Sequence, residues 1–597
     1  MISKEPNSAV NEFLTNGEAL YNMGLLDELI MVCREFLEKT DDDRVYAMLS
    51  SAEFSLGDIQ AAEKSVRAGL LIKRDNPDLL YNLACILQHK GLLSNAIRYY
   101  LRTKKVCDAA GYDNELSEIC QNEISKLEKI LGKTENELMP PKAKKNVLII
   151  AAIYPPKSGP GAQRTVKLVK NLRFFGWEPT IVTMTDIKLS SSGYEFFDEL
   201  PDDVDVIRIR PRIIKEQSDF ENVKNSLSPL LSNATREKYL HYYKTDIENR
   251  LELCSFPEPL ILWAIDVADS ICEDVDINKF GVIYSTSGPY SNHFAAYYIK
   301  QKNEIPWVAD FRDEWSNNPM LWPDKTSFLY QMCLDCEQAV FRSADSVIQV
   351  TERSFDNTVK LGVQADKLAC ITNGYDEEDF EWLSGNSNLN EKFTIVHNGS
   401  FYPGRSTITA LVAINNLINR GELDKDKILF HQGHTTTASE EEKIKNYTIS
   451  ARLEGVALIN PQMEHHSSLV LAASADLLLL LLGESADYSS TYPGKIFEYL
   501  RLDKPILCLG PHGSISDHLL NRTGHGITVD YSDIAAIEKE ILRHYNLWLD
   551  KDIGTPLLNQ SADITMYERK HLTSKHAVIF DKIAGETENR MMEYRKS

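Results

Sequence analysis

Short apolar runs, separated by polar turns and amphipathic segments, recur through the middle and the last third of the chain. One unit shows the pattern well: an apolar run at 477–482, a polar loop, a segment at 491–500 and a second run at 506–509. Runs this short predict buried strands and are far too short to cross a bilayer. In the segment between them, Thr491 could cap a helix whose first turn holds Pro493. Strand, helix and strand in this order build a parallel sheet.

The same pattern predicts two parallel sheets, one after the other. The first is expected to use strands that begin near 281 and 305 and others at 147–153, 180–183, 206–211 and 346–351. The second is expected to use a strand that begins near 393 and others at 428–431, 457–459, 477–482 and 506–509. A polar helical stretch at about 214–253 indicates an insertion in the domain that holds the first sheet. We therefore predict an α/β fold with two doubly wound, Rossmann-like domains and a cleft between them.

Residues 1–138 have a different, helical pattern that repeats. Gly24, Gly57 and Gly91 are separated by 57 − 24 = 33 and 91 − 57 = 34 residues. The third unit also carries the large and small positions Leu80, Leu83, Ala84, Leu87, Ala96 and Tyr100. This segment resembles a tetratricopeptide array capped by a helix at about 116–131, and a plain helical bundle is the alternative. Such arrays bind other proteins or dimerise, and we expect this one to pack only on itself.

Length, charge and cysteine usage narrow the class of protein. With 597 residues the chain should hold about three or four domains, and we place the boundaries at 1–138, 139–385 and 386–597. The net charge of −22 argues against a nucleic-acid partner, because phosphate binding needs a basic surface. No signal peptide is evident and the ten cysteines are scattered, so we expect a cytoplasmic protein, which could also associate with the inner face of the membrane. Cys333 and Cys336 form a single C-x-x-C, which indicates a buried helical pair and not a zinc site.

The helix predicted within 491–500 has the features of an anion site. A helix N-terminus presents unpaired N–H groups and partial positive charge, and Gly494 would let a ligand approach the backbone. Lys495 adds a full positive charge, and Glu498 lies on the same helix face three residues later. The axial distance from Pro493 to Glu498, roughly 7.5 Å, suits a diphosphate at the helix start and a ribose held by Glu498. An ordinary βα unit with a Lys–Glu surface pair is the alternative interpretation.

Each predicted sheet has a glycine-bearing loop after its first strand, where open α/β sheets bind ligands. The loop at 154–164 contains Gly161 but no G-x-G-x-x-G, so a nicotinamide cofactor is not supported. In the second sheet, Gly399 follows the first strand, and Arg405, six residues later, would face the same cleft as Lys495.

A cluster of charges ends the strand that begins near residue 305. The cluster consists of Asp310, Arg312, Asp313 and Glu314, between Trp307 and Trp315. Charges packed at the carboxyl end of a strand indicate a site more than a solvated surface. The alternative is an Arg–Asp pair that only braces a loop.

From about residue 145 to residue 530 the chain resembles a GT-B glycosyltransferase of glycosyltransferase family 4. The resemblance rests on the order of six motifs: PPKSGPGAQR at 155–164, SGPYS at 287–291, WVADFRDEW at 307–315, NGYD at 373–376, Gly399 with Arg405, and PGKIFEYL at 493–500. It implies that Arg405 binds the donor diphosphate and that Glu498 binds its ribose. Ser400 stands where the family has an arginine, and Ser490 stands where it has its first glutamate.

The resemblance implies hexosyltransferase chemistry, in which a sugar moves from a nucleotide donor to an acceptor hydroxyl with retention at the anomeric carbon. Gly161, Gly399, Thr491, Gly494 and Lys495 would join Arg405 and Glu498 at the donor, and Arg312 and Asp313 would act on the acceptor side. Because the two cations and the helix terminus would stabilise the departing diphosphate, we expect no metal cofactor. The two D-x-D sequences, at 203–205 and 274–276, are interpreted as strand and helix boundaries.

Three functions stay open at this point. The first is a transferase for a cell-surface polysaccharide or glycolipid, whose repeats hold a protein partner. The second is a protein glycosyltransferase whose repeats present the polypeptide acceptor. The third is a non-catalytic GT-B scaffold, which the missing first glutamate favours and the retained Arg405, Lys495 and Glu498 oppose.

Overall fold

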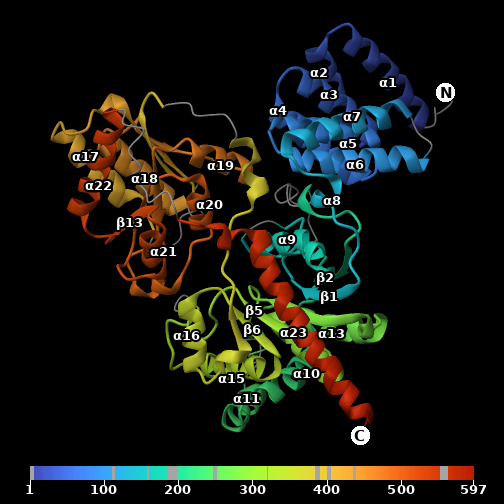
Figure 1. Ribbon diagram of the computed structural model, residues 1–597, viewed down its shortest axis with the longest axis vertical. Coiled ribbons are helices and arrows are strands. Elements are labelled where there is room, and N and C mark those ends of the chain that lie inside the picture. Colours follow the sequence, from blue (N-terminus) through green and yellow to red (C-terminus); the bar gives the residue numbers. More distant parts are fainter. Residues whose placement is uncertain are drawn as a thin grey trace.

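The chain folds into an all-helical part at the N-terminus and two α/β parts (Figure 1). The computed structural model describes residues 6–110, 114–157, 160–185, 198–245, 252–253, 255–318, 321–383, 390–399, 405–433, 438–461, 463–550 and 562–596. Within these ranges, none of the helices combines the length and the apolar character that crossing a membrane requires.

The N-terminal part consists of helices that pack as successive pairs. They are α1 (Pro6–Asn22), α2 (Leu26–Leu37), α3 (Asp43–Ser55), α4 (Ile59–Ile72), α5 (Pro77–His89), α6 (Leu93–Ala110), α7 (Asn114–Leu131) and the short α8 (Glu135–Leu138). Gly24, Gly57 and Gly91 lie in the turn within each pair at φ of +74°, +82° and +76°, a conformation that favours glycine. The predicted all-helical array is confirmed, and its assignment to the tetratricopeptide class remains a prediction.

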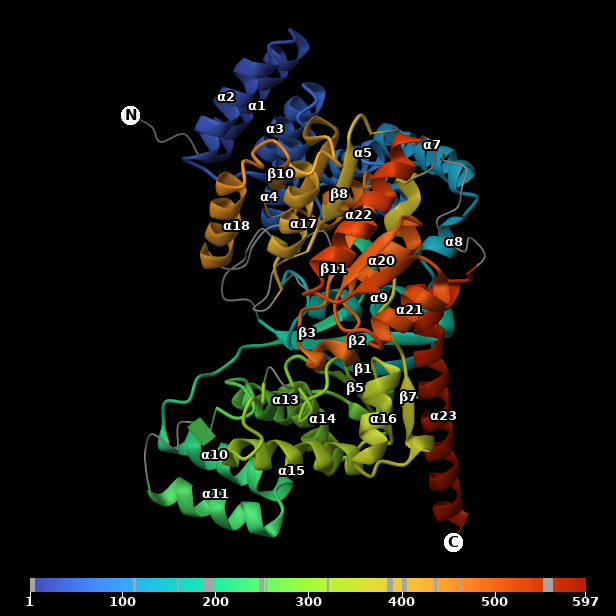
Figure 2. The ribbon, with the colours of Figure 1, turned by 90° about the vertical axis from the view of Figure 1, so that its left-hand side faces the viewer.

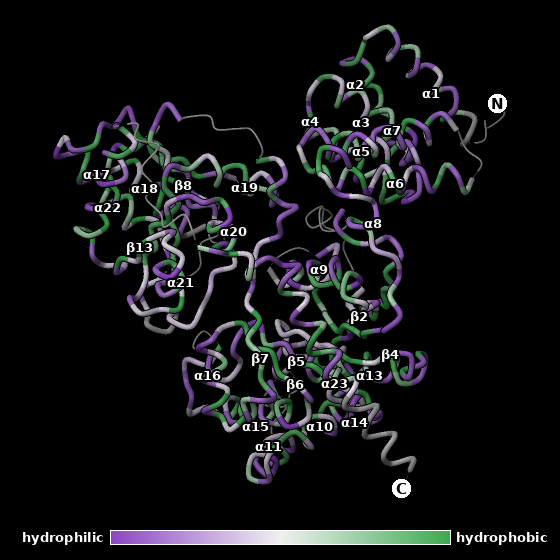
Figure 3. The backbone as a smooth tube through the Cα atoms, viewed as in Figure 1, coloured by the Kyte–Doolittle hydropathy of each residue, from purple (hydrophilic) through white to green (hydrophobic). Residues whose placement is uncertain are grey.

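The first α/β part holds a parallel sheet in the order β3-β2-β1-β4-β5-β6-β7. Its strands are β1 (Lys145–Ile150), β2 (Trp177–Met184), β3 (Asp205–Ile209), β4 (Phe280–Thr286), β5 (Trp307–Phe311), β6 (Ser346–Gln349) and β7 (Leu368–Cys370). Its helices are α9 (Pro160–Leu172), α13 (Ile261–Asp274), α14 (Ser291–Lys302), α15 (Phe328–Ser343), α16 (Glu352–Lys360) and, in the predicted insertion, α10 (Gln217–Leu227) and α11 (Asn233–Thr245). Apolar cores on both faces cover the hydrophobic strands (Figure 3), so the sheet is doubly wound as predicted.

The second α/β part holds a parallel sheet in the order β10-β9-β8-β11-β12-β13. Its strands are β8 (Phe393–His397), β9 (Ile428–Gln432), β10 (Ala457–Ile459), β11 (Leu477–Leu481), β12 (Ile506–Leu509) and β13 (Gly526–Val529). Its helices are α17 (Ile408–Asn419), α18 (Ala438–Ser450), α19 (His465–Ala473), α20 (Lys495–Leu502), α21 (Ile515–Thr523) and α22 (Ile534–Leu549). Two apolar cores again lie on opposite faces of the sheet.

The last helix, α23 (Arg569–Lys596), returns to the first sheet and runs along one side of it (Figure 2). Its buried side chains Leu572, Ala577 and Phe580 join the core that contains β1 and β4. The division made from the sequence placed residues 386–597 together in the second domain. The apolar face of α23 is covered by the first sheet instead, which the order of elements along the chain does not reveal.

The helical array lies against the rest of the molecule, so the expectation that it packs only on itself is wrong. Arg67 donates hydrogen bonds of 2.6 and 3.0 Å to the Asp198 carboxylate, and Tyr99 donates one of 2.8 Å to the same group. Arg98 donates bonds of 2.8 and 3.1 Å to Glu378, which lies between the two sheets. Buried charges of this kind are compensated only while both partners are present.

We expect Arg67→Ala to lower the free energy of unfolding by about 3–5 kcal/mol, because Asp198 would stay buried without its cation and Glu63 would keep only Lys90. Lys39→Ala is the control, since the Lys39–Glu35 pair on the same array is exposed and should not contribute measurably. Urea unfolding of both full-length variants checks this. Equal unfolding midpoints would show that the contact between array and sheet contributes nothing to stability.

Candidate active site

The predicted anion site is the start of α20, which begins at Lys495. The prediction that Thr491 caps this helix is wrong: Gly494 is the N-cap residue, and it makes no side-chain cap. Thr491 lies in the preceding turn, where its N–H donates to Tyr488 at 3.2 Å and its carbonyl accepts from Ser516 at 3.0 Å. Among the described residues, no side chain therefore caps the start of the helix.

The ammonium group of Lys495 lies over Gly399, in the loop after β8. A Cβ at position 399 would be 2.5 Å from Lys495 Nζ and 2.8 Å from His397 Nε2, so the close approach requires glycine. Burial lowers the pKa of Lys495 to about 8, with Glu498 opposing and Arg405 reinforcing the shift. No ion pair reaches Lys495 from any residue that the structure describes. A buried, unpaired cation of this kind favours an anionic ligand.

Arg405 brings a second positive charge to the same place. Its guanidinium lies 4.6 Å from the centre of the Tyr488 ring, a cation–π contact. Its charge also helps to lower the pKa of His397 to about 3, behind the larger effects of burial and of Lys495. The structure thus places Gly399, Arg405 and Lys495 together.

Glu498, one turn along α20, forms an ion pair with His465, the first residue of α19. His465 Nε2 lies 2.8 Å from Glu498 Oε1, and the Glu498 side chain is 14% exposed. Although burial opposes the shift, Glu498 raises the pKa of His465 to about 9, so the histidine is charged at neutral pH. Burial likewise opposes the lowering of the Glu498 pKa, for which His465 is the main cause. The structure therefore does not show the alternative Lys495–Glu498 surface pair.

On the first sheet, the bracing ion pair is formed by Asp310 with Arg164. Arg164 donates to Asp310 at 2.7 and 3.0 Å, and Tyr284 and Thr286 donate to the same carboxylate. Arg164 holds the pKa of Asp310 at about 2 even though burial raises it. This network takes the role that the bracing alternative gave to Arg312 and Asp313.

Arg312 and Asp313 lie next to one another at the end of β5. Arg312 Nε is 3.5 Å from Asp313 Oδ2, and the Asp313 side chain is 57% exposed. The Arg312 guanidinium lies between two glycines: a Cβ would be 2.5 Å from Nη1 at Gly161 and 2.1 Å from Nη2 at Gly288. The two glycines therefore leave room for the guanidinium, and the Asp313 carboxylate is exposed.

Helix α9 connects the two groups of residues. Gly161 in its first turn contacts Arg312, and the Gln163 side chain helps to lower the pKa of the Glu498 carboxyl in the other domain. Among the described residues, no hydrogen bond or ion pair joins Arg312 or Asp313 directly to Lys495 or Glu498. One helical turn thus borders both groups.

A cluster of three carboxylates could hold a metal by geometry, but a lysine already fills it. The oxygens of Glu199, Asp376 and Asp379 lie within 4.8 Å of one another. Lys167 Nζ lies between them, at 2.6 Å from Glu199 and 2.8 Å from each aspartate. The ammonium stands where a cation would bind, so the cluster does not fit a metal ion.

Both D-x-D sequences form the boundaries that were predicted: Asp205 begins β3, Asp274 ends α13, and Asp276 caps a short helix. Cys333 and Cys336 are buried on α15, also as predicted.

Sequence reasoning missed His465, Gln163 and Lys167. The pair His465–His466 follows a polar loop with no periodic signal, and nothing local to it indicates that α19 begins beside Glu498. Gln163 lies in the segment that was predicted as the loop 154–164, and Lys167 follows that loop. Asp379, a partner of Lys167, and Glu498, beside Gln163, are more than 200 residues away in sequence.

The comparisons with known proteins identify the fold. No protein-family model matches the chain, and no curated protein matches it significantly. The N-terminal domain of trehalose-6-phosphate phosphatase from Candida albicans is similar at a TM-score of 0.50 and 12% identity, over 74% of this chain and 97% of that one. A glycosyltransferase from Rickettsia africae ESF-5 has a TM-score of 0.49 and 13% identity, over 74% and 98% of the chains. Anabaena HepE in complex with UDP and glucose has a TM-score of 0.44 and 13% identity, over 76% and 99%.

At these identities the likeness shows the fold alone. Together with the two doubly wound sheets it confirms the predicted class: two Rossmann-like domains in the GT-B arrangement, preceded by an all-helical array.

Substitution by alanine should affect stability differently at two glycines of the site. Gly399→Ala should lower the melting temperature, because the new Cβ would displace the His397 ring and Lys495 at a cost of about 1–3 kcal/mol. Gly494→Ala should leave it unchanged or slightly raised, since nothing lies within 4 Å and φ is −52°. Calorimetry of the two variants decides; a loss of stability in Gly494→Ala alone would contradict the placement of both loops.

Proposed function

We propose that the chain is a glycosyltransferase of the family 4 type, which moves a sugar from a nucleotide-sugar donor to an acceptor hydroxyl with retention. The observation that carries the proposal is the unpaired ammonium of Lys495 at the open N-terminus of α20, with Arg405 beside it. Two cations and a helix terminus around one point match the charge of a diphosphate.

The donor would bind across the start of α20. The diphosphate would lie against Lys495, Arg405, the backbone at Gly399 and Gly494 and the side chain of Thr491, and Glu498 would accept hydrogen bonds from the ribose hydroxyls. Departure of the diphosphate builds negative charge, which the two cations and the helix terminus stabilise without a metal. Arginine stays charged throughout the working pH range, and Lys495 carries its charge below about pH 8.

The acceptor would approach from the first domain. Asp313 is exposed enough to orient an acceptor hydroxyl or to accept its proton, and Arg312 can hold Asp313 or an acceptor phosphate. Gly161 belongs to this side, because it makes room for the Arg312 guanidinium.

The acceptor we propose is a cell-surface polysaccharide or glycolipid, modified in the cytoplasm or at the inner face of the membrane. The N-terminal array would bind a protein of the same machinery, and a polypeptide acceptor presented by the array is the second candidate. A panel of nucleotide sugars in a thermal-shift assay identifies the donor, because a ligand that binds only the folded state raises stability by RT ln(1 + [L]/Kd). No shift with any nucleotide sugar would contradict the proposal.

Lys495→Ala should weaken binding of UDP or GDP by roughly 10–100-fold, the effect of removing a charged partner worth about 1.5–3 kcal/mol. Arg405→Ala should act in the same direction. Isothermal titration measures both. If either variant binds the nucleoside diphosphate as tightly as the parent, that residue does not belong to the donor site.

The affinity for the nucleoside diphosphate should also fall as pH rises. The pKa of Lys495 in the free protein is about 8, below its ordinary 10.5, so the group is charged below pH 8 and loses its proton above it. An anion binds the charged form, and affinity should drop between pH 7 and 9.5. Lys495→Arg is the control, because arginine stays charged throughout and only the part of the decline due to His465 would persist. Identical pH profiles of parent and control would contradict the role of Lys495.

Asp313→Asn should lose at least about 99% of the transfer rate while donor affinity changes by no more than about twofold. The side chain is exposed and makes only a 3.5 Å contact, so the melting temperature should stay within about a degree. Turnover, donor titration and melting are measured on one preparation. A melting temperature several degrees lower, with turnover per folded molecule unchanged, would show that Asp313 only supports the loop.

A further inference from the structure

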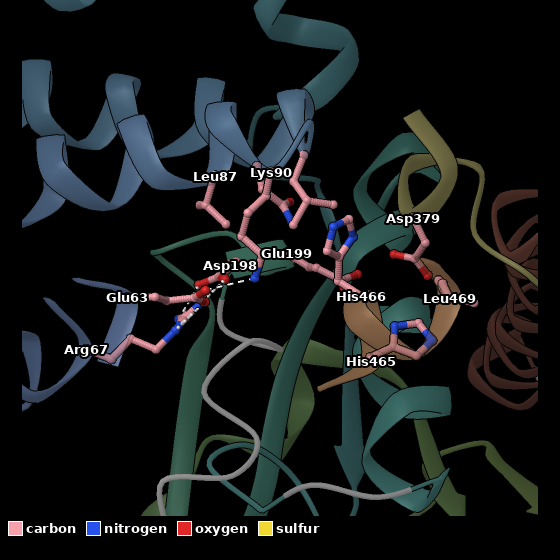
Figure 4. Close-up of a pocket in the computed structure, with 12 residues that line it drawn as sticks. Glu63, Arg67, Leu87, Lys90, Asp198, Glu199, Asp379, His465, His466 and Leu469 are labelled. Carbon is pink, nitrogen blue, oxygen red and sulfur yellow. Dashed lines mark hydrogen bonds and ion pairs between the residues drawn. The ribbon is translucent and has the colours of Figure 1, made fainter. Parts of the chain in front are cut away.

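A small polar cavity, partly open to solvent, lies where the helical array meets the two α/β parts (Figure 4). The array contributes Leu87 and Lys90 to it, and α19 contributes His465 and His466. Figure 4 shows the two histidines beside Asp379, on the side of the cavity opposite Arg67 and Glu63. The cations of the array are already paired there, Arg67 and Lys90 with Glu63, so the cavity offers no free charge to an anion.

One residue of this cavity reaches the proposed donor site. His465 Nε2 contacts Glu498 Oε1 at 2.8 Å, while the His465 ring also lines the cavity. His466, its neighbour in sequence, turns to the Trp382 ring instead, with ring centres 5.5 Å apart and planes at 82°. The two histidines thus share a cavity, and only one of them touches Glu498.

A carboxylate that binds a ribose must present its oxygens in a fixed direction. A glutamate side chain has several rotamers, and fixing it on binding costs on the order of 1 kcal/mol or more. The charged hydrogen bond from His465 holds one oxygen before any ligand arrives, and both oxygens keep lone pairs for ribose hydroxyls. The side chains of His465 and Glu498 are only 25% and 14% exposed, and limited access of water strengthens the pair.

We propose that His465 is a positioning residue for Glu498: the histidine fixes the carboxylate in the orientation that accepts the ribose hydroxyls, and the N-terminal array forms the outer wall of the cavity that contains it. The inference rests on the proposed function, because it assigns the ribose to Glu498. It gives the array a part in nucleotide binding besides any protein partner.

The test compares a ligand that has a ribose with one that lacks it, on the full-length chain. The probes are UDP, or GDP if it binds more tightly, and inorganic pyrophosphate. His465→Ala should lower the affinity for the nucleoside diphosphate about tenfold and change the affinity for pyrophosphate by no more than about twofold. His465→Gln, whose Nε2 can still donate to Glu498, should restore most of the affinity. His466→Ala, the matched control from the same cavity, should leave the affinity for both ligands unchanged.

A double-mutant cycle with Glu498→Ala separates the outcomes. The double variant should bind no more weakly than Glu498→Ala alone, because the histidine acts only through the glutamate. Two outcomes would overturn the role of His465 alone. In the first, His465→Ala lowers the affinities for nucleoside diphosphate and pyrophosphate equally. In the second, His465→Ala loses no affinity for the nucleoside diphosphate while Glu498→Ala does. If Glu498→Ala itself does not lower the affinity for the nucleoside diphosphate, the assignment of the ribose to Glu498 fails, and this inference fails with it.

Discussion

The buried ammonium of Lys167 is the interaction on which the arrangement of the molecule depends. It contacts Glu199 of the first α/β part and Asp376 and Asp379 of the segment that leads to the second, at 2.6–2.8 Å. Removing such charges from water costs several kcal/mol per ion, which is offset only while every partner stays in place. Glu378, in the same segment, is held by Arg98 of the array at 2.8 Å. The cluster therefore fixes the connection between the two sheets and secures the array to it.

Because Lys167 lies on α9, the same constraint reaches the candidate site. The first turn of α9 contacts Arg312 through Gly161 and Glu498 through Gln163, and its next turn holds Asp310 through Arg164. The charge cluster thus fixes α9 at Lys167, and the first turn of this helix contacts both groups of residues of the candidate site. This explains how the proposed acceptor and donor groups on separate sheets can be kept in position without a direct bond between them.

The sequence predicted the elements of the fold well, because buried parallel strands appear as short apolar runs and the array repeats its glycine turns. The β7 and β13 strands, only three and four residues long, lack such a run and were not foreseen. Of the site, Lys495 and Glu498 were found through a local motif at a helix start, and Arg405 through its spacing from the glycine that follows a strand. His465, Gln163 and the return of α23 depend on contacts between distant segments, and amphipathic patterns do not specify which surface covers a given face.

The account rests on the claim that the start of α20 and the loop after β8 bind a nucleoside diphosphate. Hydrogen–deuterium exchange of the full-length protein with and without saturating UDP or GDP tests this most directly, because ligand contact slows opening of the backbone that it covers. The account predicts slower exchange in residues 494–500 and around Gly399 and Arg405, with little change in α10, α11 and α15. Protection confined to other regions, or none at concentrations that raise the melting temperature, would contradict it.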